Sequence, residues 1–186
     1  STRTRVSFAA AAERLGMLPL VLRPDELQLG RGETIGDTAR TLSGYASAIV
    51  VRTFAQATVD ELAAAARKPV INALTDDHHP CQALADLLTL RERFGTLEGL
   101  RVAYVGDGNN VARSLAEAAQ LTGTEVVLAA PSGYATGIPA RVVEDPADAE
   151  AIRSCFRSRY VLARLSRLFG GYTRSVPVVV EDLAPV

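Results

Sequence analysis

Apolar residues recur along the chain in two ways, at helical spacing in some stretches and as short unbroken runs in others. The helical spacing predicts helices near 4–15, 34–45, 59–66, 80–94 and 110–121. The short runs predict strands at 18–22, 48–51, 69–72, 101–105 and 125–129. Helices that alternate with buried strands are typical of parallel α/β architecture, so we predict an α/β protein with two parallel-sheet domains.

The pattern changes at two places. The segment 95–99 contains two glycines and interrupts the alternation, which places a domain boundary near 95–100. After about Asp148 the signal weakens: 153–169 carries only a loose helical stripe, and 176–180 is a candidate strand that Pro177 limits. The segment 151–186 has six arginines against Glu181 and Asp182, so it differs in charge from the residues before it.

Composition excludes several classes of protein. The chain has 186 residues, 48% of them hydrophobic, and 20 basic against 21 acidic residues, which argues against a nucleic-acid or membrane partner. It has no long apolar run and no signal pattern, so we expect a cytoplasmic protein. Cys81 and Cys155 are too few and too distant for a disulfide framework or a zinc site, and we expect no metal. Because Ser1 opens the chain inside a motif that normally follows a strand, we expect further residues upstream.

The first five residues bring hydroxyl and guanidinium groups to the start of a predicted helix. Ser1, Thr2, Arg3 and Thr4 lie where a helix offers unpaired backbone N–H groups and the positive end of its dipole, a favourable place for an oxyanion such as phosphate. Arg3 can contact two phosphate oxygens at once. The alternative is an ordinary hydroxyl N-cap beside a solvated arginine.

Both histidines of the chain lie in the segment 72–82, which follows a predicted strand. Ligands of open α/β sheets bind at this carboxyl edge. With a helix that begins at Pro80, the ring of His79 and the amide of Gln82 can meet on one small carbonyl ligand. The alternatives are a solvated loop position for His78 and a structural loop histidine at position 79.

Two further strand ends carry polar residues. Arg52 ends the run 48–51 and can reach a carbonyl or phosphate at the same edge, or it can simply face water. The turn 106–110, Gly-Asp-Gly-Asn-Asn, follows another strand but lacks the third glycine of a dinucleotide fingerprint. Asn109 or Asn110 can bind an amino acid, and the alternative is a helix cap.

Five motifs in the same order resemble those of the ornithine carbamoyltransferases. They are Ser-Thr-Arg-Thr-Arg at 1–5, Arg-Gly-Glu-Thr-Ile-Gly-Asp-Thr-Ala-Arg at 31–40, Val-Val-Arg-Thr-Phe at 50–54, Asp-Asp-His-His-Pro-Cys-Gln-Ala-Leu-Ala-Asp-Leu-Leu-Thr at 76–89, and Gly-Asp-Gly-Asn-Asn at 106–110. The resemblance extends to about residue 148. It implies a nearly complete carbamoyl-phosphate domain over 1–95 that lacks its start, a partial ornithine-binding domain over 100–148, and a divergent tail of unknown structure over 149–186.

The resemblance also implies roles for individual residues. The phosphate of carbamoyl phosphate would be held by Ser1, Thr2, Arg3 and Thr4. The carbamoyl group would be contacted by Arg52, His79 and Gln82, with Thr4, Arg52 and His79 as the catalytic residues. Gln28 would reach a neighbouring subunit's site in a homotrimer, and Asn110 would contact ornithine.

The implied reaction is carbamoyl transfer to the δ-amine of ornithine without metal or organic cofactor, a step of arginine biosynthesis or of a urea cycle. The family's later ornithine loop, His-Cys-Leu-Pro turn and C-terminal binding arginine do not occur in the sequence, and Arg113 stands where a histidine is more usual. We therefore expect impaired activity of the chain alone. Two alternatives remain, an inactive module for carbamoyl-phosphate binding or assembly, and another carbamoyltransferase such as an aspartate-type enzyme.

Overall fold

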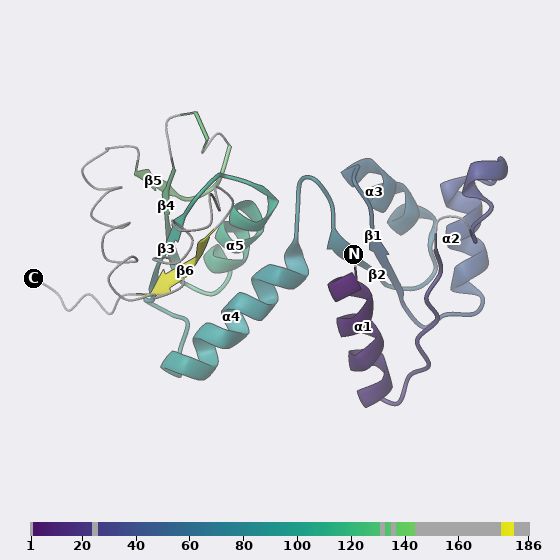
Figure 1. Cartoon of the computed structure of the whole chain (residues 1–186), viewed down its shortest axis with the longest axis horizontal. Coiled ribbons are helices and arrows are strands. Elements are labelled where there is room, and N and C mark those ends of the chain that lie inside the picture. Colours follow the sequence, from purple (N-terminus) through teal and green to yellow (C-terminus); the bar gives the residue numbers. More distant parts are fainter. Residues whose placement is uncertain (1, 24–25, 131–132, 135–136, 144–175, 181–186) are drawn as a thin grey trace, which may run out of the picture. The chain divides into compact units, whose positions relative to one another are not determined.

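The structure is a computed structural model, and it describes residues 2–23, 26–130, 133–134, 137–143 and 176–180 (Figure 1). The chain divides into two compact units, Ser1–Thr75 and Asp76–Val186, and each is considered by itself. The loose helical stripe at 153–169 lies outside the described residues.

The first unit contains a two-stranded parallel sheet and its helices. Its elements are α1 (Thr2–Arg14), the short 3₁₀ helix η1 (Leu29–Arg31), α2 (Ile35–Ser43), β1 (Ile49–Arg52), α3 (Gln56–Ala65) and β2 (Val70–Leu74). β1 and β2 run parallel, with Ile49 opposite Val70. The buried cluster of this unit consists of Ala39, Ile49 and Leu62, contributed by α2, β1 and α3.

A side-chain cap explains where α2 begins. Thr34 has extended backbone, and its Oγ1 accepts a hydrogen bond of 3.0 Å from the backbone N–H of Asp37. This bond satisfies one of the amide groups that a helix start leaves unpaired. Arg40, one turn further on, lies 2.6 Å from the Asp37 carboxylate. The cap therefore fixes the first turn of α2 and the connection that leads into it.

The predicted strand at 18–22 is wrong. Residues 17–23 adopt no regular structure, and Leu18 and Leu20 are 93% and 77% exposed. An apolar run becomes a strand only where a neighbouring strand exchanges backbone hydrogen bonds with it, and Pro19 has no N–H to donate. Among the described residues no strand pairs with this segment, so its hydrophobic pattern leads to exposure instead of burial.

The second unit contains a four-stranded sheet. Its elements are α4 (Pro80–Phe94), β3 (Arg101–Val105), α5 (Asn110–Gln120), β4 (Glu125–Ala129), β5 (Arg141–Val143) and β6 (Val176–Val180). The strand order is β5-β4-β3-β6, with β3, β4 and β5 parallel and β6 antiparallel to β3. The predicted α/β class is confirmed. The antiparallel β6 departs from a purely parallel sheet, and the three-residue β5 was too short to predict.

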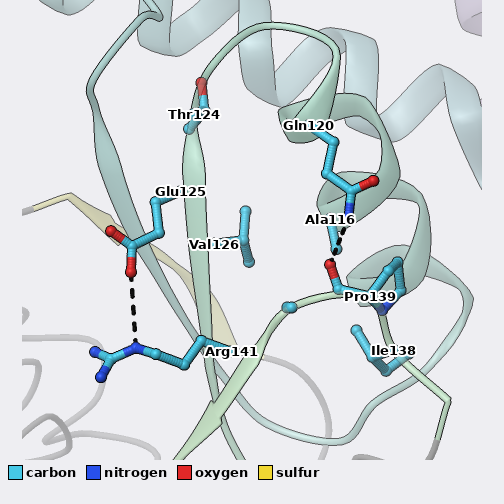
Figure 2. A pocket seen from close by; sticks show the side chains of 9 residues that line it. Ala116, Gln120, Thr124, Glu125, Val126, Ile138, Pro139 and Arg141 are labelled. Carbon is cyan, nitrogen blue, oxygen red and sulfur yellow. Dashed lines mark hydrogen bonds and ion pairs between the residues drawn. The ribbon is translucent and has the colours of Figure 1, made fainter.

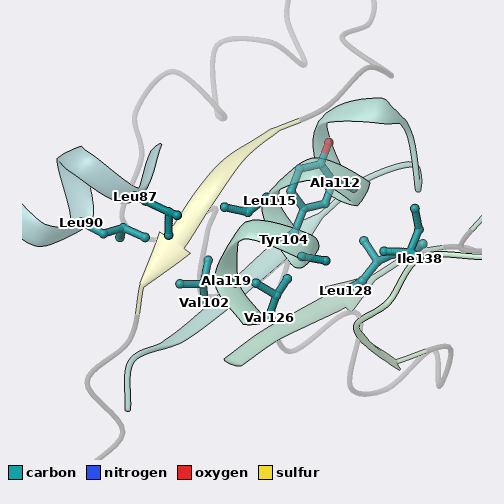
Figure 3. Close-up of a cluster of buried hydrophobic side chains, with 12 residues drawn as sticks. Leu87, Leu90, Val102, Tyr104, Ala112, Leu115, Ala119, Val126, Leu128 and Ile138 are labelled. Carbon is teal, nitrogen blue, oxygen red and sulfur yellow. The ribbon is translucent and has the colours of Figure 1, made fainter. Parts of the chain in front are cut away.

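The core of the second unit lies between its helices and its sheet (Figure 3). Leu115 of α5 and Leu128 of β4 are both fully buried, and the ring of Tyr104 on β3 is nearly so. Leu87 and Leu90 of α4 complete the cluster from the other helix. This packing fixes the position of α5, whose first residue is Asn110, the predicted ornithine contact.

Candidate active site

The most direct contact between predicted site residues joins Arg52 to Thr4. Arg52 is the last residue of β1, and its Nη1 donates a hydrogen bond of 2.9 Å to Oγ1 of Thr4, in the first turn of α1. The two residues are 48 positions apart in the chain. The fold thus brings a strand-end guanidinium to the N-terminus of a helix, where unpaired backbone N–H groups already favour an anion.

The other residues of the predicted cradle directly precede Thr4 in the chain. Thr2 and Arg3 lie in the first turn of α1 and are exposed, whereas Thr4 is half-buried. Ser1 lies outside the described residues.

Gln28 lies apart from this contact in the sequence and precedes η1. Its backbone carbonyl accepts from the N–H groups of Arg31 and Glu33, and its Oε1 lies 3.5 Å from Nη1 of Arg31. The side chain is exposed. Its predicted role at a neighbouring subunit stays a prediction.

His79 and Gln82 lie together at the start of α4, in the second unit. His79 is the N-cap residue, and its backbone N–H donates a hydrogen bond of 2.8 Å to Oγ of Ser114 on α5. Pro80 is the first helical residue, as predicted. Gln82 is exposed, and its Nε2 donates to Oδ1 of Asp86 at 2.9 Å. The start of α4 is therefore anchored to α5 through the backbone of His79.

Asp86 has an unusual environment for a carboxylate beside this helix start. Burial raises the pKa of Asp86 above its ordinary value, and the Gln82 hydrogen bond and the nearby His79 act in the opposite direction. Burial also raises the pKa of the half-buried Cys81 thiol. Neither group was among the predicted site residues, because no sequence pattern marks a partly buried acid on a helix.

His78 does not occupy the fully solvated position that we considered for it. Its side chain is 32% exposed, and its Nε2 lies 3.5 Å from Oε1 of Glu117 on α5. This contact forms an ion pair only when the imidazole is protonated. His78 therefore contributes to the attachment between the loop before α4 and α5.

The two asparagines in the turn between β3 and α5 occupy different positions at the helix start. Asn109 is the helix cap: its Oδ1 accepts from the backbone N–H groups of Val111 and Ala112 at 3.0 and 3.2 Å, and from the hydroxyl of Tyr104 at 3.3 Å. For Asn109 the structure thus shows the cap that we considered as an alternative. Asn110 is the first residue of α5 and is half-buried. Its predicted contact with ornithine stays a prediction.

A separate cavity of about 360 Å³ lies at the opposite edge of the second sheet (Figure 2). Glu125, the first residue of β4, and Gln120, the last of α5, contribute to its wall. Gln120 donates to the carbonyl of Pro139 at 3.0 Å, and Glu125 pairs with Arg101 and Arg141 at 3.0 and 3.6 Å. None of the predicted site residues lines this cavity, so the cavity does not account for the predicted site.

The predicted residues therefore belong to two groups within two units. Thr2, Arg3, Thr4 and Arg52 lie in the first unit, where the structure shows the Thr4–Arg52 contact. His79, Gln82 and Asn110 lie in the second unit. Within the described ranges, no cluster of three or more His, Cys, Asp or Glu side chains is arranged to hold a metal ion, and no helix is long and apolar enough to cross a membrane.

Comparison with known protein families shows to which family the chain belongs. Residues 1–92 match the profile described as the aspartate/ornithine carbamoyltransferase carbamoyl-P binding domain, and residues 98–154 match the Asp/Orn binding domain of the same family. The chain belongs to the aspartate/ornithine carbamoyltransferase family. The two matches include the motifs on which the resemblance was based.

Individual members of the carbamoyltransferase family agree with this assignment. An ornithine carbamoyltransferase of Bacillus subtilis strain 168 is 58% identical over 134 residues, which cover 72% of this chain and 42% of the relative. A crystal structure of the ornithine carbamoyltransferase of Thermus thermophilus has a TM-score of 0.74 at 44% identity and covers 80% of this chain and 54% of that one. The chain thus spans less than half the length of the Bacillus relative.

An aspartate-specific member of the family is also similar. The aspartate transcarbamoylase of Trypanosoma cruzi, solved in complex with carbamoyl phosphate, has a TM-score of 0.65 at 33% identity. The match covers 72% of this chain and 43% of that one. The ornithine enzyme of Thermus thermophilus is more similar on both measures.

Proposed function

We propose that this polypeptide carries the carbamoyl-phosphate half of an ornithine carbamoyltransferase site and takes part in the transfer of a carbamoyl group to the δ-amine of ornithine. The products are citrulline and phosphate. The observation that carries the proposal is the hydrogen bond between Arg52 and Thr4, because it joins two motif residues at a helix N-terminus suited to phosphate. The Trypanosoma cruzi relative, which binds carbamoyl phosphate in its crystal structure, supports the same first substrate.

The chemistry follows from where charge develops. The neutral δ-amine attacks the carbamoyl carbon and a tetrahedral oxyanion forms. The carbon–oxygen bond to phosphate then breaks, and the proton that the amine loses passes to the departing phosphate. Thr4, Arg52 and His79 stabilise the oxyanion, and Gln82 orients the carbamoyl amide. Removal of one such donor costs about 3 kcal/mol of barrier.

The phosphate leaves as an anion and needs its own partners. Ser1, Thr2 and Arg3, with the backbone N–H groups at the start of α1, hold the phosphate in the substrate and as it departs. Much of the remaining rate enhancement comes from the positioning of two substrates against each other. The proposed mechanism uses no metal and no organic cofactor.

The proposal includes the second substrate and the assembly. Asn110 contacts ornithine, and Gln28 reaches the site of a neighbouring subunit in a homotrimer that works in the cytoplasm in arginine synthesis. The proposed domains are 1–95 for carbamoyl phosphate and 100–148 for part of the ornithine site. The similarity to ornithine enzymes over most of the chain supports this choice of amine.

The test is citrulline formation by the full chain, with carbamoyl phosphate and either ornithine or aspartate as the amine. The proposal predicts citrulline from ornithine, no carbamoyl-aspartate, and loss of turnover in Arg52→Ala. A folded chain that binds carbamoyl phosphate but turns over neither amine would favour an inactive binding module. Carbamoyl-aspartate as the only product would assign the aspartate-type activity.

A further inference from the structure

A polar network joins α3 to the C-terminal end of β2 in the first unit. Oε1 of Gln56 accepts a hydrogen bond of 2.7 Å from Oγ1 of Thr75 and a longer one of 3.4 Å from Nδ2 of Asn72. Nε2 of Gln56 donates to Oδ1 of Asp60 at 2.9 Å. Asp60 can only accept as a carboxylate, so it dictates which end of the Gln56 amide faces β2. The amide therefore has one defined orientation.

This network lies at an irregularity of the parallel sheet. Val51 of β1 is opposite Asn72, but the next residue, Arg52, is opposite Leu74, so the register shifts by one residue. The additional residue of β2 is Ala73, which is fully buried. Such bulges change the direction in which nearby side chains point and are common beside active sites.

The network and the bulge occupy the same few residues. Asn72 comes directly before Ala73, and Thr75 follows shortly after it, so the two hydrogen-bond donors to Gln56 bracket the bulge. Thr75 is fully buried, so its hydroxyl needs an acceptor inside the protein. Gln56 itself begins α3, four positions after Arg52. One side chain thus connects the exit from β1 to both sides of the bulge in β2.

We propose that Gln56 is a positioning residue for Arg52. Its side-chain carbonyl holds the two polar groups that bracket the β2 bulge, and the shifted register places Arg52 where its guanidinium meets Thr4. Gln56 touches neither substrate and acts through Arg52. The inference rests on the proposed function, because Arg52 is assigned there to the carbamoyl group.

The test compares the affinities of the full chain for carbamoyl phosphate and for inorganic phosphate by calorimetric titration. Gln56→Leu removes the acceptor for Thr75 and Asn72 while it keeps a side chain of similar size. We expect its affinity for carbamoyl phosphate to fall about tenfold or more, because a misplaced Arg52 loses the carbamoyl oxygen. Affinity for inorganic phosphate should change less than about threefold, because the Arg3 cradle remains. Gln120→Leu, which removes a glutamine hydrogen bond in the second unit, is the matched control and should change neither affinity.

A second pair of variants distinguishes the loss of specific Gln56 contacts from misfolding. Gln56→Glu keeps an acceptor for Thr75 and Asn72 but places a carboxylate against Asp60, so carbamoyl-phosphate binding should weaken. Adding Asp60→Asn supplies an amide donor in place of the repelling oxygen, and binding should recover to within about threefold of the original affinity. Thermal melting of each variant shows whether it remains folded at the titration temperature.

Three results would overturn the inference. Gln56→Leu could bind carbamoyl phosphate as well as the original chain, or it could lose carbamoyl phosphate and inorganic phosphate equally, which indicates a general structural role. The double variant could bind no better than Gln56→Glu. In each case the original chain still binds carbamoyl phosphate, so the proposed function stands. If the original folded chain does not bind carbamoyl phosphate, the proposed function and the inference both fail.

Discussion

The two units of the chain differ in how much they bury and in what they offer to a ligand. In the described residues, the core cluster of the first unit has three buried members and α1 has no buried residue, whereas the cluster of the second unit has twelve buried members. The first unit nevertheless carries the Arg52–Thr4 contact and the other residues of the proposed phosphate cradle. Sites that bind ligands often lie in the less stable parts of a protein. The comparison therefore separates the larger buried core, which lies in the second unit, from the proposed phosphate cradle, which lies in the first.

Truncation of one core leucine in each unit should produce the largest difference in unfolding free energy between the two units. Leu115 is fully buried in the second unit, whereas Leu62 in the first is 8% exposed and has few buried neighbours. Leu115→Ala should cost about 4 kcal/mol of unfolding free energy and Leu62→Ala about 2 kcal/mol. Urea unfolding combined with amide hydrogen exchange measures both changes unit by unit. An equal or larger cost for Leu62→Ala would show that the first unit is packed as tightly as the second.

Replacement by alanine should lower the stability of the protein at one glycine and raise it at another. Gly123, in the second unit, has φ +71°, and an added Cβ would lie 3.3 Å from Cγ of Glu98. Gly123→Ala should therefore destabilise the protein by about 1–2 kcal/mol. Gly36 lies within α2, where the nearest atoms to an added Cβ are the Arg40 guanidinium at 3.4 and 3.5 Å and Ala65 Cβ at 3.6 Å. Gly36→Ala should stabilise by about 0.5–1 kcal/mol because alanine favours a helix.

Thermal melting of the two glycine variants provides the measurement. A lower melting temperature for Gly36→Ala would mean that α2 and α3 approach each other too closely for a methyl group. An unchanged melting temperature for Gly123→Ala would show that this turn tolerates a side chain despite its backbone angle.

Removal of the side-chain caps of α2 and α5 should cost less stability than the core substitutions, and the two costs should be more alike. Asn109→Ala removes an acceptor that serves two backbone N–H groups and should cost about 1.5 kcal/mol. Thr34→Ala removes one such bond and should cost about 1 kcal/mol. Asn109→Asp and Thr34→Ser keep an acceptor and are the controls. Chemical unfolding tests the order, and a larger loss for Thr34→Ala would reverse it.

The carboxylates of Asp37 and Asp86 should make the stability of the folded protein depend on pH in opposite directions. Hydrogen bonds and charge from Arg40, with a hydrogen bond from Thr34, hold the pKa of Asp37 below its ordinary 3.8. Its stabilising effect is present above that ordinary value and is lost as pH falls through the lower folded pKa. Burial raises the pKa of Asp86, so its contribution is greatest at low pH and is lost as pH rises through the raised value.

Melting between about pH 3 and pH 7 separates the two carboxylates. Asp37→Asn should flatten the loss of stability at the acid end, and Asp86→Asn should remove a penalty at neutral pH. If Asp86→Asn destabilises at neutral pH, its hydrogen bond with Gln82 outweighs the cost of burying its charge.

The sequence predicted those elements whose signals are local. Pro80 and the apolar spacing after it located α4, and apolar runs located β3 and β4 to the residue. The strand at 18–22 was wrong because strand formation depends on a pairing partner, which the run itself does not specify.

The candidate site was predictable only in part for a related reason. Motif residues placed Thr4 at a helix start and Arg52 at a strand end, but their hydrogen bond depends on the three-dimensional fold. The Gln56 network was not predicted, because a glutamine in a helix carries no distinctive pattern and its role depends on a bulge that only the strand register reveals. The helix caps could be predicted in part. The sequence allowed Asn109 to be a cap or a ligand, and the structure shows that it is the cap of α5.

The most direct test of the central claim is a calorimetric titration of the full chain with carbamoyl phosphate, carried out beside Arg3→Ala and Arg14→Ala. Both arginines are exposed on α1 and both variants lose one positive charge, but Arg14 lies in the last turn and Arg3 in the first. If the first unit carries the phosphate site, Arg3→Ala should weaken binding about a hundredfold, as expected for a lost bidentate charged contact, and Arg14→Ala should bind as the original does. Equal affinities for all three folded proteins would contradict the account.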